Sequence, residues 1–70
     1  MKKIKAPLDG FVLSIKVGEG DCVKKGQILA VILLLKMENP IQCDRDGVVK
    51  EILIKEKSRI KTGQVIMCIE

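Results

Sequence analysis

The chain has 70 residues, 47% of them hydrophobic, which is enough for one small domain with a limited core. It contains no histidine, tryptophan or tyrosine, and this excludes histidine-based catalysis and most of the base-stacking side chains of nucleic-acid modules. The formal net charge is +4, but basic and acidic residues alternate along the chain, which is typical of a mixed soluble surface that binds neither nucleic acid nor membrane.

Short β-strands and turns are predicted along the whole chain. Runs of β-branched and other apolar residues are separated by clusters of glycine, proline, aspartate and lysine. No stretch has the period of an amphipathic helix, so the chain is predicted to be all-β and to form one domain over residues 1–70. In chain order, strands are expected at residues 2–6, 11–17, 22–23, 28–35, 41–43, 48–54, 60 and 65–69.

An internal repeat relates the two halves of the chain. When the sequence is shifted by 37 residues, Asp9-Gly10 falls on Asp46-Gly47 and Gly26-Gln27 falls on Gly63-Gln64. The repeat predicts two interleaved halves around a pseudo-twofold axis, folded as a flattened barrel or sandwich of antiparallel strands. Residues 34–40 join the halves and have no counterpart, so their symmetry partner is the pair of chain ends.

The pattern also predicts which apolar side chains are buried. The run of eight apolar residues at 28–35 is expected to be buried on both faces, and it is too short to span a bilayer. Cys43 and Cys68 align with small or apolar residues and are expected to act as small hydrophobic residues, whereas Cys22 aligns with Arg59 and is expected to be exposed. Reduced cysteines and the lack of a signal peptide indicate a cytoplasmic protein. The predicted core consists of Ile4, Val12, Ile15, Val17, Val23, Ile28, Ala30, Ile32, Ile41, Val49, Ile52, Ile54, Ile60, Val65 and Ile69.

Lys36 is the candidate functional residue. It lies in the join between the halves, follows a strand that the core should hold in place, and is flanked by the apolar Leu35 and Met37. A lysine at a hairpin tip can be gripped by another protein, and its amine can be acylated. The alternative is an ordinary solvated lysine near a turn. No catalytic constellation, metal-ligand cluster or phosphate-binding loop is present.

These residues carry a resemblance to a known family. The chain resembles the biotinyl/lipoyl attachment domains, and among them the biotin carboxyl carrier domains. The resemblance covers almost the whole chain, and it rests on an ordered set of motifs, each of them modest alone. The matching segments are Ala6-Pro7-Leu8-Asp9-Gly10, residues 17–27 (Val-Gly-Glu-Gly-Asp-Cys-Val-Lys-Lys-Gly-Gln), Lys36-Met37-Glu38-Asn39, Asp46-Gly47-Val48-Val49 and Gly63-Gln64-Val65-Ile66.

The resemblance implies a fold and a function. The family fold is a flattened barrel or sandwich of two four-stranded antiparallel sheets. The implied cofactor is biotin, amide-linked by a biotin protein ligase to the ε-amine of Lys36, while Leu35, Met37 and Glu38 form the recognition hairpin. The domain would then be a non-catalytic carrier that moves a carboxyl group between a biotin carboxylase and a carboxyltransferase. Two alternatives are an unmodified assembly module of the same fold and a lipoyl carrier, although lipoyl domains usually have Asp before the lysine and Ala or Thr after it.

The chain departs from the family pattern at two places. The family motif has Glu-Ala-Met before the lysine, whereas this chain has Leu33-Leu34-Leu35, which predicts an apolar patch near the hairpin tip. Lys57-Ser58 replaces the family's Gly-Asp in the second copy, which predicts a distorted turn there. Asn39-Pro40 is the stronger local turn signal, but the family places the tight turn at Lys36-Met37, where a strained backbone is therefore expected.

Overall fold

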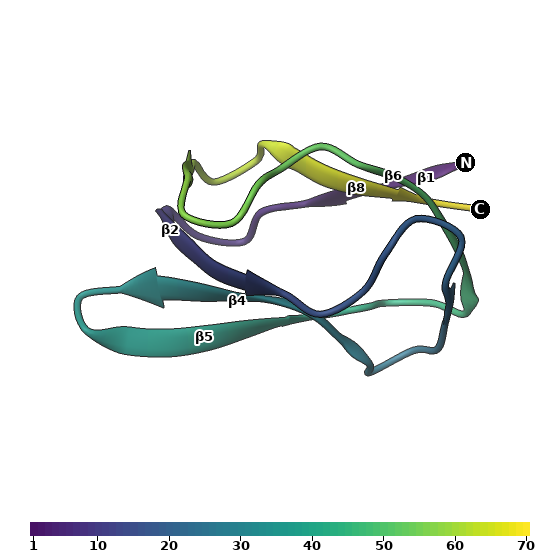
Figure 1. Ribbon diagram of the computed structural model, residues 1–70, viewed down its shortest axis with the longest axis horizontal. Coiled ribbons are helices and arrows are strands. Elements are labelled where there is room, and N and C mark those ends of the chain that lie inside the picture. Colours follow the sequence, from purple (N-terminus) through teal and green to yellow (C-terminus); the bar gives the residue numbers. More distant parts are fainter.

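The computed structural model describes residues 1–70, which form two four-stranded antiparallel sheets packed as a sandwich (Figure 1). One sheet has the strand order β1-β8-β6-β3 and the other β5-β4-β2-β7, so the predicted all-β fold class is confirmed. None of its segments forms a helix of the length and hydropathy that a membrane span requires. The strands are β1 (Lys2–Lys5), β2 (Gly10–Ile15), β3 (Cys22–Val23), β4 (Ile28–Leu34), β5 (Met37–Gln42), β6 (Gly47–Ile52), β7 (Arg59–Ile60) and β8 (Val65–Ile69).

The predicted pseudo-twofold repeat is present in the strand pairing. The pair Val12↔Ile32 of β2 and β4 recurs, 37 residues later, as Val49↔Ile69 of β6 and β8. The β4–β5 hairpin likewise corresponds to the pairing of β8 with β1, which are the two ends of the chain. In Figure 1 both termini lie at one end of the sandwich and the hairpin tip lies at the other. The join is therefore the one feature of the scaffold without a symmetry-related copy.

Irregular pairing decides which side of β4 is buried. Ile28 pairs with Gln42 and Ala30 with Ile41, so Leu29 is an extra residue in β4, a β-bulge. The bulge breaks the alternation of faces, and as a result Leu29 and Ala30 are both fully buried while Ile28 is 41% exposed. The predicted burial of Ile28 is therefore wrong. The prediction that this run is buried on both faces is also wrong.

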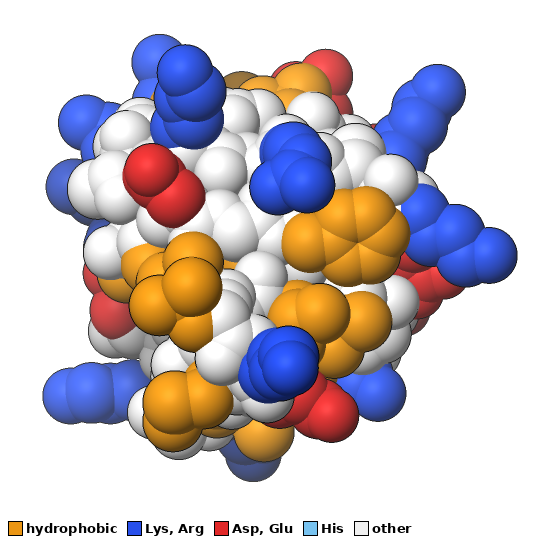
Figure 2. All heavy atoms as spheres, turned by 90° about the vertical axis from the view of Figure 1, so that its left-hand side faces the viewer, with side chains coloured by type: hydrophobic (Ala, Val, Ile, Leu, Met, Phe, Trp, Pro, Cys, Tyr) orange, Lys and Arg blue, Asp and Glu red, His pale blue; other side chains and the backbone are white.

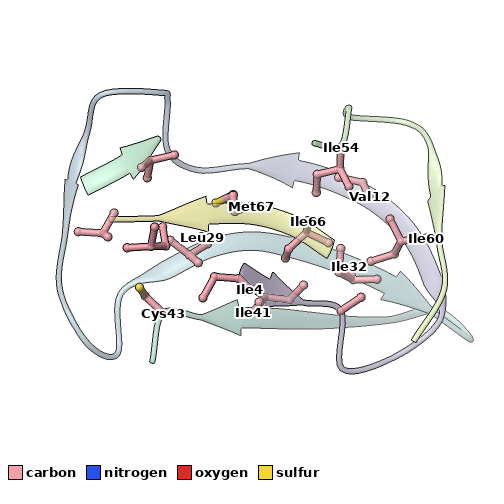
Figure 3. Close-up of a cluster of buried hydrophobic side chains, with 14 residues drawn as sticks. Ile4, Val12, Leu29, Ile32, Ile41, Cys43, Ile54, Ile60, Ile66 and Met67 are labelled. Carbon is pink, nitrogen blue, oxygen red and sulfur yellow. The ribbon is translucent and has the colours of Figure 1, made fainter. Parts of the chain in front are cut away.

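The remaining core agrees largely with the prediction. Fourteen buried side chains form one cluster between the sheets (Figure 3). Ile15, Val17 and Ile52 pack against it from partly exposed positions, and Val65 is half-buried. Cys43 and Cys68, which are predicted to act as small hydrophobic residues, are buried, and Cys22 is exposed, as expected. The core residues that the sequence pattern missed are Ala6, Leu29, Ile66 and Met67.

The repeated Asp-Gly motif has a packing reason. A Cβ atom on Gly10 would lie 2.7 Å from the carbonyl oxygen of Leu33, and one on Gly47 would lie 2.6 Å from that of Glu70. No real Cβ atom tolerates such contacts with backbone. The two glycines therefore allow the chain to cross closely over β4 and β8, at equivalent places in the two halves.

The turn at Lys57 keeps the geometry of its first copy. Lys57 has a φ of 67°, and its counterpart Gly20 has a φ of 92°. The amide of Lys57 donates to Val12 O and that of Gly20 donates to Val49 O, both at 2.7 Å. The predicted distortion is therefore wrong: the tertiary hydrogen bond holds Lys57 in a left-handed conformation that an L-residue adopts only at a cost.

Candidate functional site at the β4–β5 hairpin tip

The hairpin closes one residue earlier than predicted. Leu34 pairs with Met37, and Leu35 and Lys36 form a two-residue loop with φ values of 52° and 64°. Positive φ at both central residues characterises the type I′ turn, whose twist matches that of the flanking strands. The predicted strain at Lys36 is confirmed, but the second strained residue is Leu35 and not Met37. The register follows from Ile32 and Ile41, because a slip by one residue would move both out of the core.

Asn39 and Pro40 lie inside β5, so their local turn signal does not predict the fold here. Pro40 is tolerated because β5 is an edge strand, where a missing backbone donor breaks no ladder. Asn39 has a structural role that sequence reasoning missed. Its Nδ2 donates to Met37 O at 3.0 Å and, more weakly, to Ile32 O at 3.4 Å, which ties the two strands together just below the tip. The only sequence signal was its place in the Lys-Met-Glu-Asn motif.

The tip presents an amine in an apolar setting. Leu35 is 86% exposed, Met37 67% and Leu34 36%, which confirms the predicted apolar patch. Lys36 is exposed and takes part in neither of the two ion pairs of the protein. Figure 2 views the molecule from the hairpin end and shows hydrophobic side chains gathered there among basic ones.

Two carboxyl groups away from the tip, those of Asp9 and Asp44, have lowered pKa values. Hydrogen bonds from the Thr62 amide and hydroxyl, at 2.8 and 2.9 Å, lower the pKa of Asp9. The neighbouring Arg45 guanidinium lowers the pKa of Asp44 through two hydrogen bonds of 2.7 Å. No group of three His, Cys, Asp or Glu residues is placed to hold a metal ion. The tip itself offers the exposed primary amine of Lys36.

The structure brings all four predicted site residues together. Lys36 occupies the loop with Leu35, Met37 follows it as the first residue of β5, and Glu38 is exposed opposite Leu33. The position of the hairpin depends on the contacts that β4 makes in the core with residues distant in the sequence. The side chains that form the tip all come from these four consecutive residues. Comparison with known proteins places the chain in a family. Residues 1–69 match the biotin/lipoyl family model, described as biotin-requiring enzyme.

The chain belongs to the biotin/lipoyl attachment family. It is 40% identical over 58 residues to the biotin/lipoyl attachment protein of Bacillus subtilis, covering 83% of this chain and 80% of that protein. It is 37% identical over 67 residues to the pyruvate carboxylase of Staphylococcus aureus, covering 96% of this chain but 6% of that enzyme. The urea carboxylase of Kluyveromyces lactis contains the same fold, with a TM-score of 0.91 at 22% identity over 99% of this chain and 6% of that structure.

Family membership confirms the fold and the non-catalytic carrier role predicted from the sequence. The chain spans 10% of an acyl-coenzyme A carboxylase subunit of Mycobacterium leprae and 6% of the pyruvate carboxylase, and it matches most of the length of the Bacillus subtilis protein. Sequence related to this chain is thus found both within large carboxylases and as a small protein.

Proposed function

We propose that biotin is attached to Lys36 and that the domain carries a carboxyl group between two active sites. The observation that carries this proposal is the exposed, unpaired Lys36 amine on a two-residue loop, in a chain that matches the family over residues 1–69. A ligase would use ATP to activate the carboxyl group of biotin as an acyl-adenylate, releasing pyrophosphate. The deprotonated Lys36 Nζ then attacks the carboxyl carbon, the amide C–N bond forms, the C–O bond to AMP breaks, and the amine proton goes to solvent. The positive charge of the amine is lost in this step.

The hairpin suits a tethered cofactor. Its strands are held by the core at Ile32 and Ile41, so the loop is presented in one orientation, while the four-carbon lysine stem remains flexible. A tethered group visits two sites without dissociating, which raises its effective concentration at each. The proposed partners are a biotin protein ligase, a biotin carboxylase and a carboxyltransferase. The carboxylases among the relatives support the last two.

Biotin is favoured over lipoate by the residues on either side of the lysine. Leu35 and Met37 are both largely exposed apolar side chains, whereas lipoyl domains usually place Asp before the lysine. The exposed Leu34 and Leu35 favour a second candidate, an unmodified module that uses this patch for assembly. Mass spectrometry distinguishes the three functions.

The test is intact-mass analysis of the chain after co-expression with an active biotin protein ligase and free biotin. The wild-type chain should gain the mass of one biotinyl group. Lys36→Arg keeps the charge and should gain none, whereas the control Lys24→Arg, at another exposed turn lysine, should be modified like the wild type. An unmodified wild-type chain beside a fully modified reference biotinyl domain would refute the proposal, and a lipoyl increment would favour the lipoyl carrier.

A further inference from the structure

The outer faces of the two sheets differ although the halves are pseudosymmetric. On the sheet β1-β8-β6-β3, the exposed Lys50 and Glu70 form an ion pair of 3.1 Å. The equivalent residues of the other sheet, 37 positions earlier, are Leu13 and Leu33. One face is therefore charged, as expected for a surface in water, and the other is apolar at the same places.

The apolar part of this face lies mainly over the two central strands, β2 and β4. Phe11 pairs with Leu33, and neither is fully buried, whereas the residues next to them, Val12 and Ile32, are fully buried on the core side. Because alternate residues of a strand point to opposite faces, Phe11 and Leu33 lie on the outer face. The remaining apolar positions of this face are Val31, its partner Pro40, and the bulge residue Leu13.

One row of paired residues on this face, running across the four strands, has oppositely charged residues at its two ends. Leu33 lies between Glu38 of β5 and Phe11 of β2. Phe11 in turn pairs on its other side with Arg59 of β7. The row therefore reads Glu38–Leu33–Phe11–Arg59 across β5, β4, β2 and β7. Neither charged residue takes part in an ion pair within the chain. Cross-strand partners share a face, so the row presents an acidic end, an apolar centre and a basic end.

We propose that this face binds the same face of a second copy of the chain. A twofold axis parallel to the strands, in the plane between the two sheets, reverses the row of the partner. Each Glu38 then lies opposite the partner's Arg59, and each Leu33 lies opposite the partner's Phe11. A twofold axis across the strands would instead bring Glu38 against the partner's Glu38. The charges therefore select the first arrangement, an isologous contact between aligned sheets.

The chosen axis has a consequence for the carrier. A rotation about an axis parallel to the strands leaves both hairpins pointing the same way, so the two Lys36 residues lie at the same end of the dimer. The contact is small, because the whole molecule extends only 31 × 18 × 17 Å, so that one face covers at most about 560 Å², below the roughly 800 Å² per partner of a standard stable interface. The dimer is therefore weak and forms at high concentration.

Sedimentation equilibrium of the wild-type chain from micromolar to millimolar concentration tests this interface. The weight-average mass should rise toward that of a dimer. Glu38→Arg and Arg59→Glu should each weaken self-association by at least about tenfold, because each places like charges opposite one another twice. An equimolar mixture of these two variants should recover wild-type association, since every contact in the mixed dimer then pairs opposite charges.

A second test of the interface introduces the ion pair of the charged face into the apolar face. The double substitution Leu13→Lys with Leu33→Glu copies the Lys50–Glu70 pair onto the apolar face, and it should fold and remain monomeric. The matched control, Lys50→Glu with Glu70→Lys, reverses the pair on the charged face and should self-associate like the wild type. A wild-type chain that stays monomeric over the whole range would overturn the proposal. So would association that survives the transplanted pair, or a mixture that remains monomeric.

Discussion

Replacement of Lys57 by glycine should stabilise the protein. Lys57 has a φ of 67° and is exposed, so its side chain gains little from packing there. A left-handed conformation costs an L-residue about 1–2 kcal/mol, and the greater chain entropy of an unfolded glycine takes back about 0.5–1 kcal/mol. The midpoints of these two ranges give a net gain in the free energy of unfolding of about 0.75 kcal/mol, or a rise in Tm of roughly 3–6 °C for a domain of this size.

Urea and thermal unfolding followed by far-UV circular dichroism measure this effect. Lys57→Ala removes the charge but keeps the Cβ atom, so its stability should stay close to that of the wild type. Gly20→Ala is the reverse test at the equivalent turn, where φ is 92° and a Cβ atom would meet nothing within 4 Å. It should destabilise by about 0.75 kcal/mol, because the left-handed cost of about 1–2 kcal/mol is partly offset by about 0.5–1 kcal/mol from the lower entropy of the unfolded alanine chain. If Lys57→Gly and Lys57→Ala shift the midpoint equally, the backbone argument is wrong and the charge is responsible.

Three further predictions concern packing, the hairpin and pH. Gly10→Ala should lower the free energy of unfolding, measured in urea, by at least the about 1–3 kcal/mol that an overpacked core costs. The reason is that its Cβ atom would meet the backbone oxygen of Leu33 at 2.7 Å. Asn39→Ala should cost about 1 kcal/mol and speed amide exchange in the hairpin, because the bond to Met37 O is lost; unchanged exchange would contradict this role. Hydrogen bonds from Thr62 lower the pKa of Asp9 in the folded state. The ionised Asp9 therefore stabilises the folded protein at pH values above the ordinary carboxyl pKa, and this contribution is lost as pH falls through the pKa of Asp9 in the folded state. Asp9→Asn should accordingly flatten the acid limb of a plot of Tm against pH.

Part of the candidate site could be predicted from the sequence because its signals are local. Lys36 was identified from its place in the join and from the motif it shares with a known family. The family resemblance predicts the turn pair one residue late, at Lys36-Met37. Local residue preferences do not correct it, because neither Leu35 nor Lys36 is a residue that favours positive φ. Their conformation is imposed by the pairing of β4 with β5, which is a property of the hairpin and not of the two residues. Asn39 was missed as a support for the same reason, since its acceptors lie on both strands.

The sequence by itself determined the all-β class, the 37-residue repeat, most of the core and the residue that carries the proposed function. These follow from composition, strand periodicity and motif order, which are encoded over short distances. Only the tertiary structure decided the bulge at Leu29, the exposure of Ile28 and the contrast between the two outer faces. Each of these depends on which strands pair and in which register. A single extra residue in one strand reverses the inward and outward positions that periodicity predicts.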